Sequence, residues 1–343
     1  MLEDPGLQGI FRTDFRARAA YAEGAGIYRI VPSAVALPAV REDLTRLVQW
    51  ARRTGTPLIP RGAGSGMCGA NVGSGTVVDL SSLPALLEIN RAERRARVSP
   101  GITAGQLNQR AAEYGLRLPP DPSSAAWATL GGMVSTNAAG PLSLRYGSMR
   151  PWVHALEVVT DDGENGRSVR GSKDSEHQPP AAFQRFAREV APVLRKSADL
   201  IRQHFPRARK NSSGFALDAW LQSGDTVDLW VGGEGTLGFI SEIEIRLDPT
   251  PAARAVLQIA LADLDQLVQV VTSLLGLQPS TIELLDRTFL DLVSDAAGPE
   301  VLRHVPAATQ AVLVVDFERD NSAAVRGAVG DAARVAGPWA LDR

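Results

Sequence analysis

Hydrophobic residues recur at helical spacing in two stretches of the first half of the chain, residues 40–53 and residues 103–114. This period predicts two amphipathic helices. A glycine follows each of them, Gly55 and Gly115. Glycine commonly ends a helix because it adopts left-handed backbone angles at little cost. A longer helical stretch is predicted over residues 181–205.

Short apolar or alternating runs predict strands around these helices. The expected strands are residues 28–31, 86–89, 95–99, 153–160, the run 227–231 before a glycine-rich turn, and the run 239–247 after it. Residues 91–94 are expected to join the second and third of them as a hairpin. Residues 11–22 and 216–221 are predicted to be short helices. The polar residues 161–180 are predicted to be a surface excursion.

The pattern changes at the proline-bounded residues 249–251. Beyond them strands and helices alternate, which is typical of an α+β unit. The expected elements are strands at 255–260, 281–285 and 311–317, and helices at 264–275, 287–294 and 323–335. Only eight residues follow the last helix, too few for a further strand and helix. We therefore expect residues 250–343 to form an incomplete domain.

A glycine-rich stretch at residues 57–80 stands out from this background. Its glycines are Gly62, Gly64, Gly66, Gly69, Gly73 and Gly75. Glycine has no Cβ and tolerates positive φ, so backbone N–H groups can crowd together and face an anion. Arg61 adds a positive charge, and a pyrophosphate is the simplest ligand. Residues 64–69 match G-x-G-x-x-G, but a strand follows where the Rossmann motif requires a helix. A glycine-rich surface turn is the alternative for this stretch alone.

Two further stretches are rich in small residues. Residues 119–147 carry almost no charge before Arg145. Small side chains there let the backbone lie flat against a large ring system, while Thr and Asn hydrogen-bond its polar edge. A well-packed loop is the alternative. Residues 232–238 form a second G-x-G-x-x-G turn, from Gly233 to Gly238, again followed by a strand.

Length and composition narrow the class of protein. A chain of 343 residues favours about two domains. It has 44% hydrophobic and 22% charged residues and a net charge of -2, which gives no footprint for nucleic acid. One cysteine, Cys68, excludes a disulfide framework and an internal iron–sulfur cluster. Neither a signal-peptide pattern nor an apolar run of spanning length is present, which predicts an intracellular protein.

The sequence lacks the usual catalytic motifs. Neither G-x-S-x-G nor H-E-x-x-H occurs, and the four histidines lack ligand spacing. His154, on a predicted strand, is expected to be structural, and Cys68 is expected to be a small buried residue. No metal site is predicted. Glycine-rich turns without an acid–base constellation indicate a bound cofactor that supplies the chemistry itself.

The small-residue stretches together resemble the FAD-binding half of the vanillyl-alcohol oxidase and p-cresol methylhydroxylase superfamily. The similar branch holds D-lactate dehydrogenase, glycolate oxidase and D-2-hydroxyglutarate dehydrogenase. The motifs that carry the resemblance are PRGAGSG at 60–66, DPSS at 121–124, TLGG at 129–132, TNAAG at 136–140, RYG at 145–147, KNSSG at 210–214 and GEGTLG at 233–238. They cover about residues 25–250. ELLD at 283–286 resembles the start of the family's substrate domain.

The resemblance implies an α+β protein with a two-subdomain FAD-binding fold of the p-cresol methylhydroxylase type at residues 32–249. An N-terminal extension (1–31) precedes it, and a partial ferredoxin-like substrate domain (250–343) follows. Residues implied in cofactor binding are Pro60, Arg61, Gly62, Ala63, Gly64, Ser65, Gly66, Gly69, Ala70, Pro122, Thr129, Gly131, Gly132, Ser135, Thr136, Asn137, Ala139, Gly140, Tyr146, Glu234, Gly235, Gly238 and Ile240. Ser65 stands where covalent relatives often have histidine, so the resemblance implies non-covalent FAD. Gly66 replaces a serine of many relatives, which removes one hydroxyl contact.

The implied activity is oxidation of a D-2-hydroxy acid (lactate, glycolate or 2-hydroxyglutarate) by hydride transfer to flavin N5. The implied electron acceptor is a separate protein or an iron–sulfur partner. The catalytic base is not identified, because relatives continue past Arg343 with a histidine metal site and a substrate-binding arginine. A fragment or a truncated gene is expected. A flavin-binding fragment with little turnover and another flavoenzyme of this fold, an ether-lipid synthase or an NADPH-fed reductase, are the alternatives. We expect a cytoplasmic location, with peripheral attachment to the inner membrane as the alternative.

Overall fold

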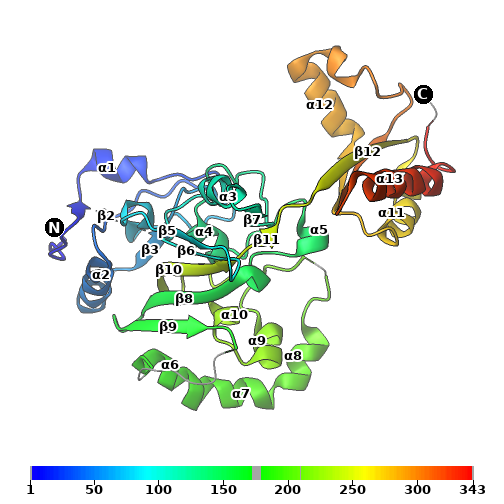
Figure 1. Cartoon of the computed structure of the whole chain (residues 1–343). Coiled ribbons are helices and arrows are strands. Elements are labelled where there is room, and N and C mark those ends of the chain that lie inside the picture. The colour runs from blue at the N-terminus through cyan, green and yellow to red at the C-terminus, as the bar shows by residue number, and fades with distance from the viewer. Residues whose placement is uncertain (1, 172–178, 209, 342–343) are drawn as a thin grey trace. The chain divides into compact units, whose positions relative to one another are not determined.

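The computed structural model describes residues 2–171, 179–208 and 210–341. The chain forms two compact units (Figure 1). The first consists of Met1–Ala139 and Ser148–Pro249, and the second of Gly140–Gly147 and Thr250–Arg343. The chain therefore enters the second unit briefly before returning to the first.

One sheet of the first unit is built around the glycine-rich stretch. Its strand order is β1-β2-β4-β3, with β1 (Ile10–Arg12), β2 (Ala34–Leu37), β3 (Leu58–Arg61) and β4 (Thr76–Asp79). The last three strands are parallel, and α2 (Arg41–Thr54) supplies the buried residues Leu44 and Leu47 to their core. Gly55 ends α2 with φ 68°, as expected. The loop from β3 to β4 thus leaves and re-enters a parallel sheet.

A second, antiparallel sheet holds the largest core of this unit. Its order is β5-β6-β10-β8-β9, with β5 (Leu87–Asn90), β6 (Arg95–Val98), β8 (Val153–Thr160), β9 (Asn165–Val169) and β10 (Gly238–Arg246). Helices α3 (Ala104–Ala112) and α4 (Leu130–Ser135) bury Leu107 and Met133 in that core. Thr103 and Gln106 cap α3 reciprocally. A short ribbon pairs β7 (Leu116–Arg117) with β11 (Asp248–Pro249).

The long helical stretch that the sequence predicts is present but divided. It consists of α6 (Ala181–Arg185), a π-helical turn (Phe186–Val190), α7 (Ala191–Lys196) and α8 (Ala198–His204). Pro192 stands in the first turn of α7, where its missing N–H costs least. Two shorter helices follow, α9 (Leu217–Ser223) and α10 (Val227–Trp230).

The second unit is a three-stranded antiparallel sheet with helices, so the expected α+β pattern is confirmed. Its order is β12-β14-β13, with β12 (Ala253–Leu261), β13 (Thr281–Asp286) and β14 (Ala311–Arg319). Helices α11 (Leu267–Leu275) and α13 (Ser322–Ala336) share its core with Leu313 and Phe317. The unit also holds α5 (Ser143–Tyr146) and α12 (Arg287–Ala297). Ala340 forms a bridge to Leu261, so the chain returns to the β12 edge.

Three sequence predictions of local structure are wrong. Residues 28–31 form no strand, because only Arg29 pairs, in an isolated bridge with Glu23. The run before the second glycine turn is helix α10, since a short apolar run does not distinguish a strand from a buried helix. The polar excursion contains strand β9, which pairs with β8. The short first helix is α1 (Phe15–Ala20), preceded by β1.

Candidate functional site

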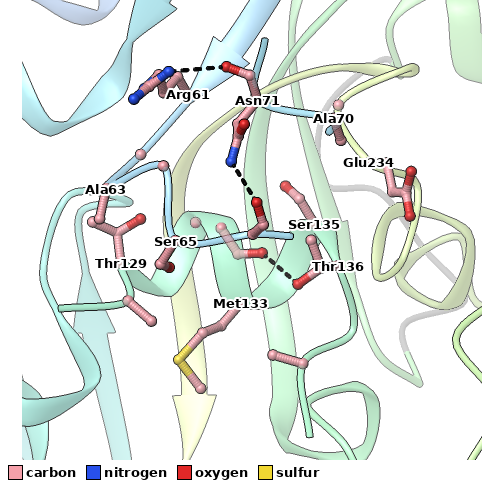
Figure 2. A pocket seen from close by; sticks show the side chains of 18 of the residues that line it. Arg61, Ala63, Ser65, Ala70, Asn71, Thr129, Met133, Ser135, Thr136 and Glu234 are labelled. Carbon is pink, nitrogen blue, oxygen red and sulfur yellow. Dashed lines mark hydrogen bonds between the residues drawn. The ribbon is translucent and has the colours of Figure 1, made fainter. Parts of the chain in front are cut away.

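A cavity of about 420 Å³ opens in the first unit between three segments that are far apart in the sequence (Figure 2). One wall is the loop between β3 and β4, the second is α4, and the third is the turn at Glu234 and Gly235. Its volume falls within the usual range of ligand sites, about 300–1,000 Å³. Arg61 and Glu234 supply the formal charges of its lining.

The glycine loop leaves its backbone donors free. Among the described residues, the N–H groups from Ala63 to Asn71 have no protein acceptor. Most residues of this run line the cavity. Because backbone donors are rarely left unpaired, such a run is suited to bind a ligand rich in acceptor oxygens.

The loop is nevertheless held in shape by its carbonyl groups. Ala25 donates its N–H to the carbonyl of Gly64 at 2.9 Å. Asn71 donates its side-chain amide to the carbonyl of Gly66 at 3.0 Å. Gly64 has φ +71°, a left-handed conformation that other residues adopt at a cost. The carbonyls are therefore bound on one side while the N–H groups remain available.

Arg61 lines the cavity, but its guanidinium is committed to the protein. It donates to the carbonyls of Tyr21 (3.3 Å), Asn71 (3.3 Å) and Glu23 (2.7 Å). It also stacks on the Tyr21 ring, 5.3 Å from the centroid. Burial lowers the pKa of Arg61. The side chain joins the start of the loop, its end and the preceding segment.

Helix α4 gives the cavity a wall without bulk. A Cβ on Gly131 would come within 2.6 Å of Pro100, and a Cβ on Gly62 within 2.0 Å of the Thr129 hydroxyl. Gly132 lines the cavity, and a Cβ there would meet only the Thr129 hydroxyl, at 3.3 Å. Gly62 therefore lets the glycine loop pack closely on Thr129, at the start of α4, and Gly131 lets α4 pack closely on Pro100. Gly132 adds no side chain to the cavity wall.

The third wall is a turn with strained backbone. Gly232, Glu234 and Gly235 all have positive φ, and for Glu234 the value is 51°. The N–H of Glu234 donates to the carbonyl of Ser135 at 2.9 Å. A Cβ on Gly235 would lie 2.8 Å from Pro60. The turn is thus docked on α4 and on the start of the glycine loop.

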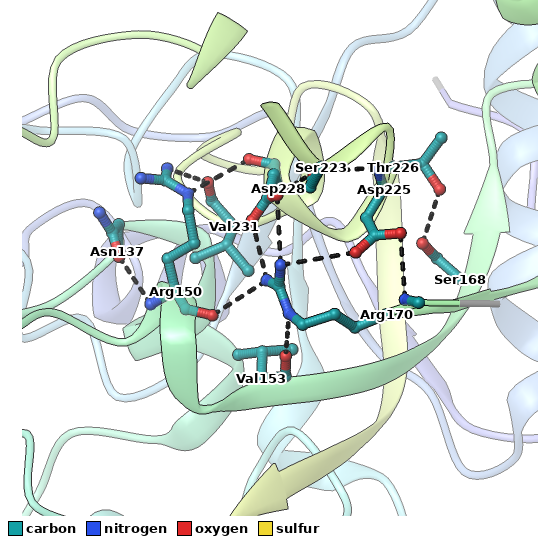
Figure 3. A network of polar contacts seen from close by, with 11 residues as sticks. Asn137, Arg150, Val153, Ser168, Arg170, Ser223, Asp225, Thr226, Asp228 and Val231 are labelled. Atoms are coloured by element: carbon teal, nitrogen blue, oxygen red, sulfur yellow. Dashed lines mark hydrogen bonds and ion pairs between the residues drawn. The ribbon is translucent and has the colours of Figure 1, made fainter. Parts of the chain in front are cut away.

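A buried polar network fixes the chain just before this turn (Figure 3). Arg150 donates to the carbonyls of Val231 at 2.6 Å and Asp228 at 3.4 Å. Arg170 binds the Asp228 carboxylate with two donors, at 2.8 and 3.2 Å, and donates to the Arg150 carbonyl. Asp228 is only 3% exposed. The network therefore satisfies a buried carboxylate and anchors the third wall.

Most of the predicted cofactor residues come together around this cavity. Those that line it are Pro60, Arg61, Gly62, Ala63, Gly64, Ser65, Gly66, Ala70, Pro122, Thr129, Gly131, Gly132, Ser135, Thr136, Glu234 and Gly235. Gly238 and Ile240 line a smaller cavity that shares Ser135 and Gly235 with it. The prediction missed Met133 and Ala138, which lie between predicted positions, and Ser212 and Ser213, which belong to the KNSSG motif.

The other predicted positions are placed elsewhere. Gly69 has φ +88° and packs against the Tyr28 ring. Asn137 is buried and accepts the N–H of Arg150 at 3.0 Å, and Ala139 is the last residue before the chain enters the second unit. Gly140 and Tyr146 belong to the second unit, where the Tyr146 hydroxyl donates to Glu318 at 2.7 Å.

Other predicted features have clear positions. His154 lies on β8 with its Nε2 atom 4.0 Å from Glu244, and Cys68 is exposed rather than buried, which corrects the expectation. In the part of the chain that the structure describes, no group of three or more His, Cys, Asp or Glu could hold a metal ion. No helix there combines the length and apolarity needed to cross a membrane.

Comparison with known proteins gives this site a context. Residues 32–167 match the model of the FAD binding domain, and residues 250–337 match that of the C-terminal domain of FAD linked oxidases. D-2-hydroxyglutarate dehydrogenase of Pantoea ananatis is 30% identical over 86% of this chain and 30% of its own length. Glycolate oxidase subunit GlcD of Bacillus subtilis is 27% identical over 84% of this chain and 52% of its own.

A solved structure of alkyldihydroxyacetonephosphate synthase has a TM-score of 0.67 with this chain. It covers 96% of this chain and 57% of its own, at 19% identity, so it shows the shared fold. The FAD binding domain model matches the earlier part of the chain, and the model of the C-terminal domain matches the later part. The chain therefore carries an FAD binding domain followed by the C-terminal domain of FAD linked oxidases.

Proposed function

We propose that the chain binds FAD non-covalently in the cavity of the first unit and oxidises a D-2-hydroxy acid. The observation that carries the cofactor assignment is the run of free N–H groups from Ala63 to Asn71 along one wall. The relatives named D-2-hydroxyglutarate dehydrogenase and glycolate oxidase support the substrate class.

The residues present fit FAD by size and polarity. The free N–H groups would hold the pyrophosphate, whose oxygens accept hydrogen bonds and carry negative charge. The low wall at Gly132, with Ala138 beside it, suits a flat ring system. Glu234 and Gly235, which pack against α4, would contact the adenosine half of FAD or the edge of its ring system. These assignments use the chain's own cavity and no part of the second unit.

Non-covalent attachment is supported by the residue at one position of the cavity lining. Ser65 stands at the position where covalent relatives often carry histidine, and serine is a poor nucleophile toward a flavin. Cys68 is a second lining nucleophile, so its role needs a direct control. Acid precipitation should release the flavin from the wild-type protein and from Cys68→Ser equally. Flavin that precipitates with the wild type but not with Cys68→Ser would identify a cysteinyl link instead.

When bound, FAD would supply the redox chemistry by accepting the substrate's α-hydrogen together with two electrons as one hydride, and a base outside the residues assigned here would take the hydroxyl proton. The chain's contribution is to hold the cofactor rigidly and to give it a mostly uncharged environment. The electrons then pass to a separate acceptor, a protein or an iron–sulfur partner.

The test combines spectroscopy and turnover. The purified protein should be yellow with an FAD spectrum, and anaerobic addition of the correct hydroxy acid should bleach it. D-2-Hydroxyglutarate, glycolate and D-lactate are compared, and an artificial electron acceptor reports turnover. An FAD spectrum that NADPH bleaches, and no hydroxy acid bleaches, would overturn the oxidase assignment. A colourless protein that fails to take up added FAD would overturn the cofactor assignment too.

A further inference from the structure

The segment at residues 21–26, which we call the bracing segment, lies upstream of the region that matches the FAD binding domain model. It nevertheless packs on the glycine loop at several points. The N–H of Ala25 donates to the Gly64 carbonyl at 2.9 Å. Two carbonyls of the segment, those of Tyr21 and Glu23, accept from the Arg61 guanidinium. Donors and acceptors of these hydrogen bonds all belong to the protein, so the bonds form without a ligand.

The packing is close enough that two glycines are required. A Cβ on Gly24 would come within 2.7 Å of the Asn71 side chain and 2.8 Å of the Gly64 carbonyl. A Cβ on Gly26 would come within 2.4 Å of the Met67 carbonyl. Contacts below 3.0 Å with backbone atoms force a displacement. The glycine loop and the bracing segment are therefore in direct contact, and no space remains for a side chain at Gly24 or Gly26.

Two polar side chains connect this surface to the parallel sheet. The Tyr21 hydroxyl donates to the Asp79 carboxylate at 2.6 Å, at the end of β4. Arg61, at the end of β3, bridges the bracing segment and the Asn71 carbonyl. A Cβ on Gly64 would lie 2.6 Å from the Arg61 guanidinium. Arg61 thus lies beneath the loop at Gly64 with its donors directed at carbonyl groups.

We propose that the bracing segment and Arg61 are a positioning device for the cofactor: they bind the carbonyls of the glycine loop so that its N–H groups stay free for a pyrophosphate. Arg61 then acts on the cofactor through the loop backbone rather than by a direct ion pair. The inference rests on the proposed FAD site, but its central claim concerns the loop of the unliganded protein.

The first experiment compares Arg61→Lys with Arg61→Gln. Lysine keeps the charge but cannot reproduce a planar fork that reaches three carbonyls. We expect both variants to lose FAD affinity by about tenfold or more, because each removes hydrogen bonds made by a charged group. Near-normal affinity in Arg61→Lys, with loss only in Arg61→Gln, would show that the charge alone matters and would overturn the proposal.

The second experiment measures backbone amide exchange, in the protein without FAD, at Ala25, Ile30 and Val72, whose N–H groups donate to the carbonyls of Gly64, Ala22 and Gly69 at 2.9, 2.8 and 3.2 Å. Exchange should be faster in Arg61→Lys and in Gly24→Ala than in the wild type. Ile27→Ala is the matched control, because Ile27 lies just outside the bracing segment and is 94% exposed. Unchanged exchange in Gly24→Ala, or lost FAD affinity without faster exchange in Arg61→Lys, would overturn the proposal.

Two safeguards keep the result interpretable. Should Gly24→Ala fail to fold, Tyr21→Phe decides, since it removes only the hydroxyl bond to Asp79; unchanged exchange there would count against the bracing role. Should the wild type bind no FAD, the proposed function fails, while the exchange comparison still tests the bracing role by itself.

Discussion

The chain contains the G-x-G-x-x-G pattern twice, at residues 64–69 and 233–238. The two copies differ in the hydrogen-bond partners of their backbone N–H groups. In the first copy the N–H groups have no acceptor among the described residues. In the second, Gly233, Glu234 and Thr236 all donate to protein carbonyls. The same spacing of glycines therefore gives an open donor array in one place and a docked wall in the other.

The difference lies in what surrounds each copy. The first copy is braced through its carbonyls, at Gly64 and Gly66, by residues on the other side of the loop. The second copy follows helix α10 and is attached to α4 by the N–H of Glu234, which donates to the Ser135 carbonyl. A glycine motif thus predicts close approach and positive φ, whereas the hydrogen-bond partners decide whether it can hold an anion.

The largest expected effect comes from Gly64→Val in the first copy. Gly64 has φ +71°, and a β-branched residue is strongly disfavoured there. The added Cβ would also meet the Arg61 guanidinium. Left-handed strain and overpacking together cost about 4 kcal/mol, equivalent to a loss of about 1,000-fold in FAD affinity. Equilibrium titration with FAD measures the change.

Gly66→Ala is the matched control for that variant. Gly66 lines the same cavity, lacks a positive φ, and a Cβ there meets only the Asn71 amide at 3.5 Å. The loop should keep its shape in Gly66→Ala. Normal FAD binding by Gly64→Val would remove the distinction between the two copies.

Arg170→Leu should have the next largest effect, on stability rather than on the donor array. It leaves the Asp228 carboxylate, 3% exposed, with its ion pair broken. Removing one partner of a buried pair costs about 3–5 kcal/mol of unfolding free energy. Urea unfolding of the apoprotein measures this. A loss below about 1 kcal/mol, the value for an exposed ion pair, would mean that the second copy is not anchored by this network.

Gly235→Ala tests the wall that the second copy provides. Gly235 has φ +78°, and its Cβ would lie 2.8 Å from Pro60, so the turn must move away from the glycine loop. We expect FAD affinity to fall by about tenfold, since left-handed alanine costs about 1–2 kcal/mol. Gly224→Ala is a matched control: it has φ +77° but open space around its Cβ. Equal effects of the two variants on FAD affinity would mean that the contact with Pro60 is unimportant.

The sequence predicted the positions of this site better than its connections. Gly62, Gly131 and Gly235 could be found because close backbone approach excludes every other residue type. The hydrogen bonds of Arg61 could not, because a charged residue beside a glycine loop suggests a phosphate contact. Its partners are the main-chain carbonyls of residues 21, 23 and 71. Every residue type has a main-chain carbonyl, so the sequence cannot identify these partners.

The same limit explains the misjudged elements of the fold. Helix α10 was predicted as a strand because residues 227–231 are a short, mostly apolar run before a glycine-rich turn, and such a run does not distinguish a strand from a buried helix. The buried ion pair of Asp228 with Arg170 joins residues 58 positions apart, and local periodicity holds no information about it. Helix α2 was predicted well because its own amphipathic face and Gly55 determine it locally.

Tyr21→Phe should have the smallest effect, and it distinguishes the braced copy by its dependence on pH. Burial, followed by the hydrogen bond and the charge of Asp79, raises the pKa of Tyr21 in the folded protein. A pKa raised on folding stabilises the fold fully below the unfolded value, about 10 for tyrosine, and this contribution declines as pH rises above it. Wild-type stability should therefore fall more steeply than that of Tyr21→Phe between about pH 9.5 and 11. At pH 7 the variant should lose about 1.5 kcal/mol of unfolding free energy, the lower end for a hydrogen bond to a charged group, because the Asp79 carboxylate keeps its bonds from Ser81. Urea unfolding at pH 7 measures the loss of unfolding free energy, and urea unfolding between about pH 9.5 and 11 measures its dependence on pH. Tyr114→Phe is the control for general alkaline effects, because the hydroxyl of Tyr114 has no hydrogen-bond partner in the described chain. Parallel pH profiles of wild type and Tyr21→Phe would show that the Tyr21 hydroxyl does not hold the bracing segment to the sheet.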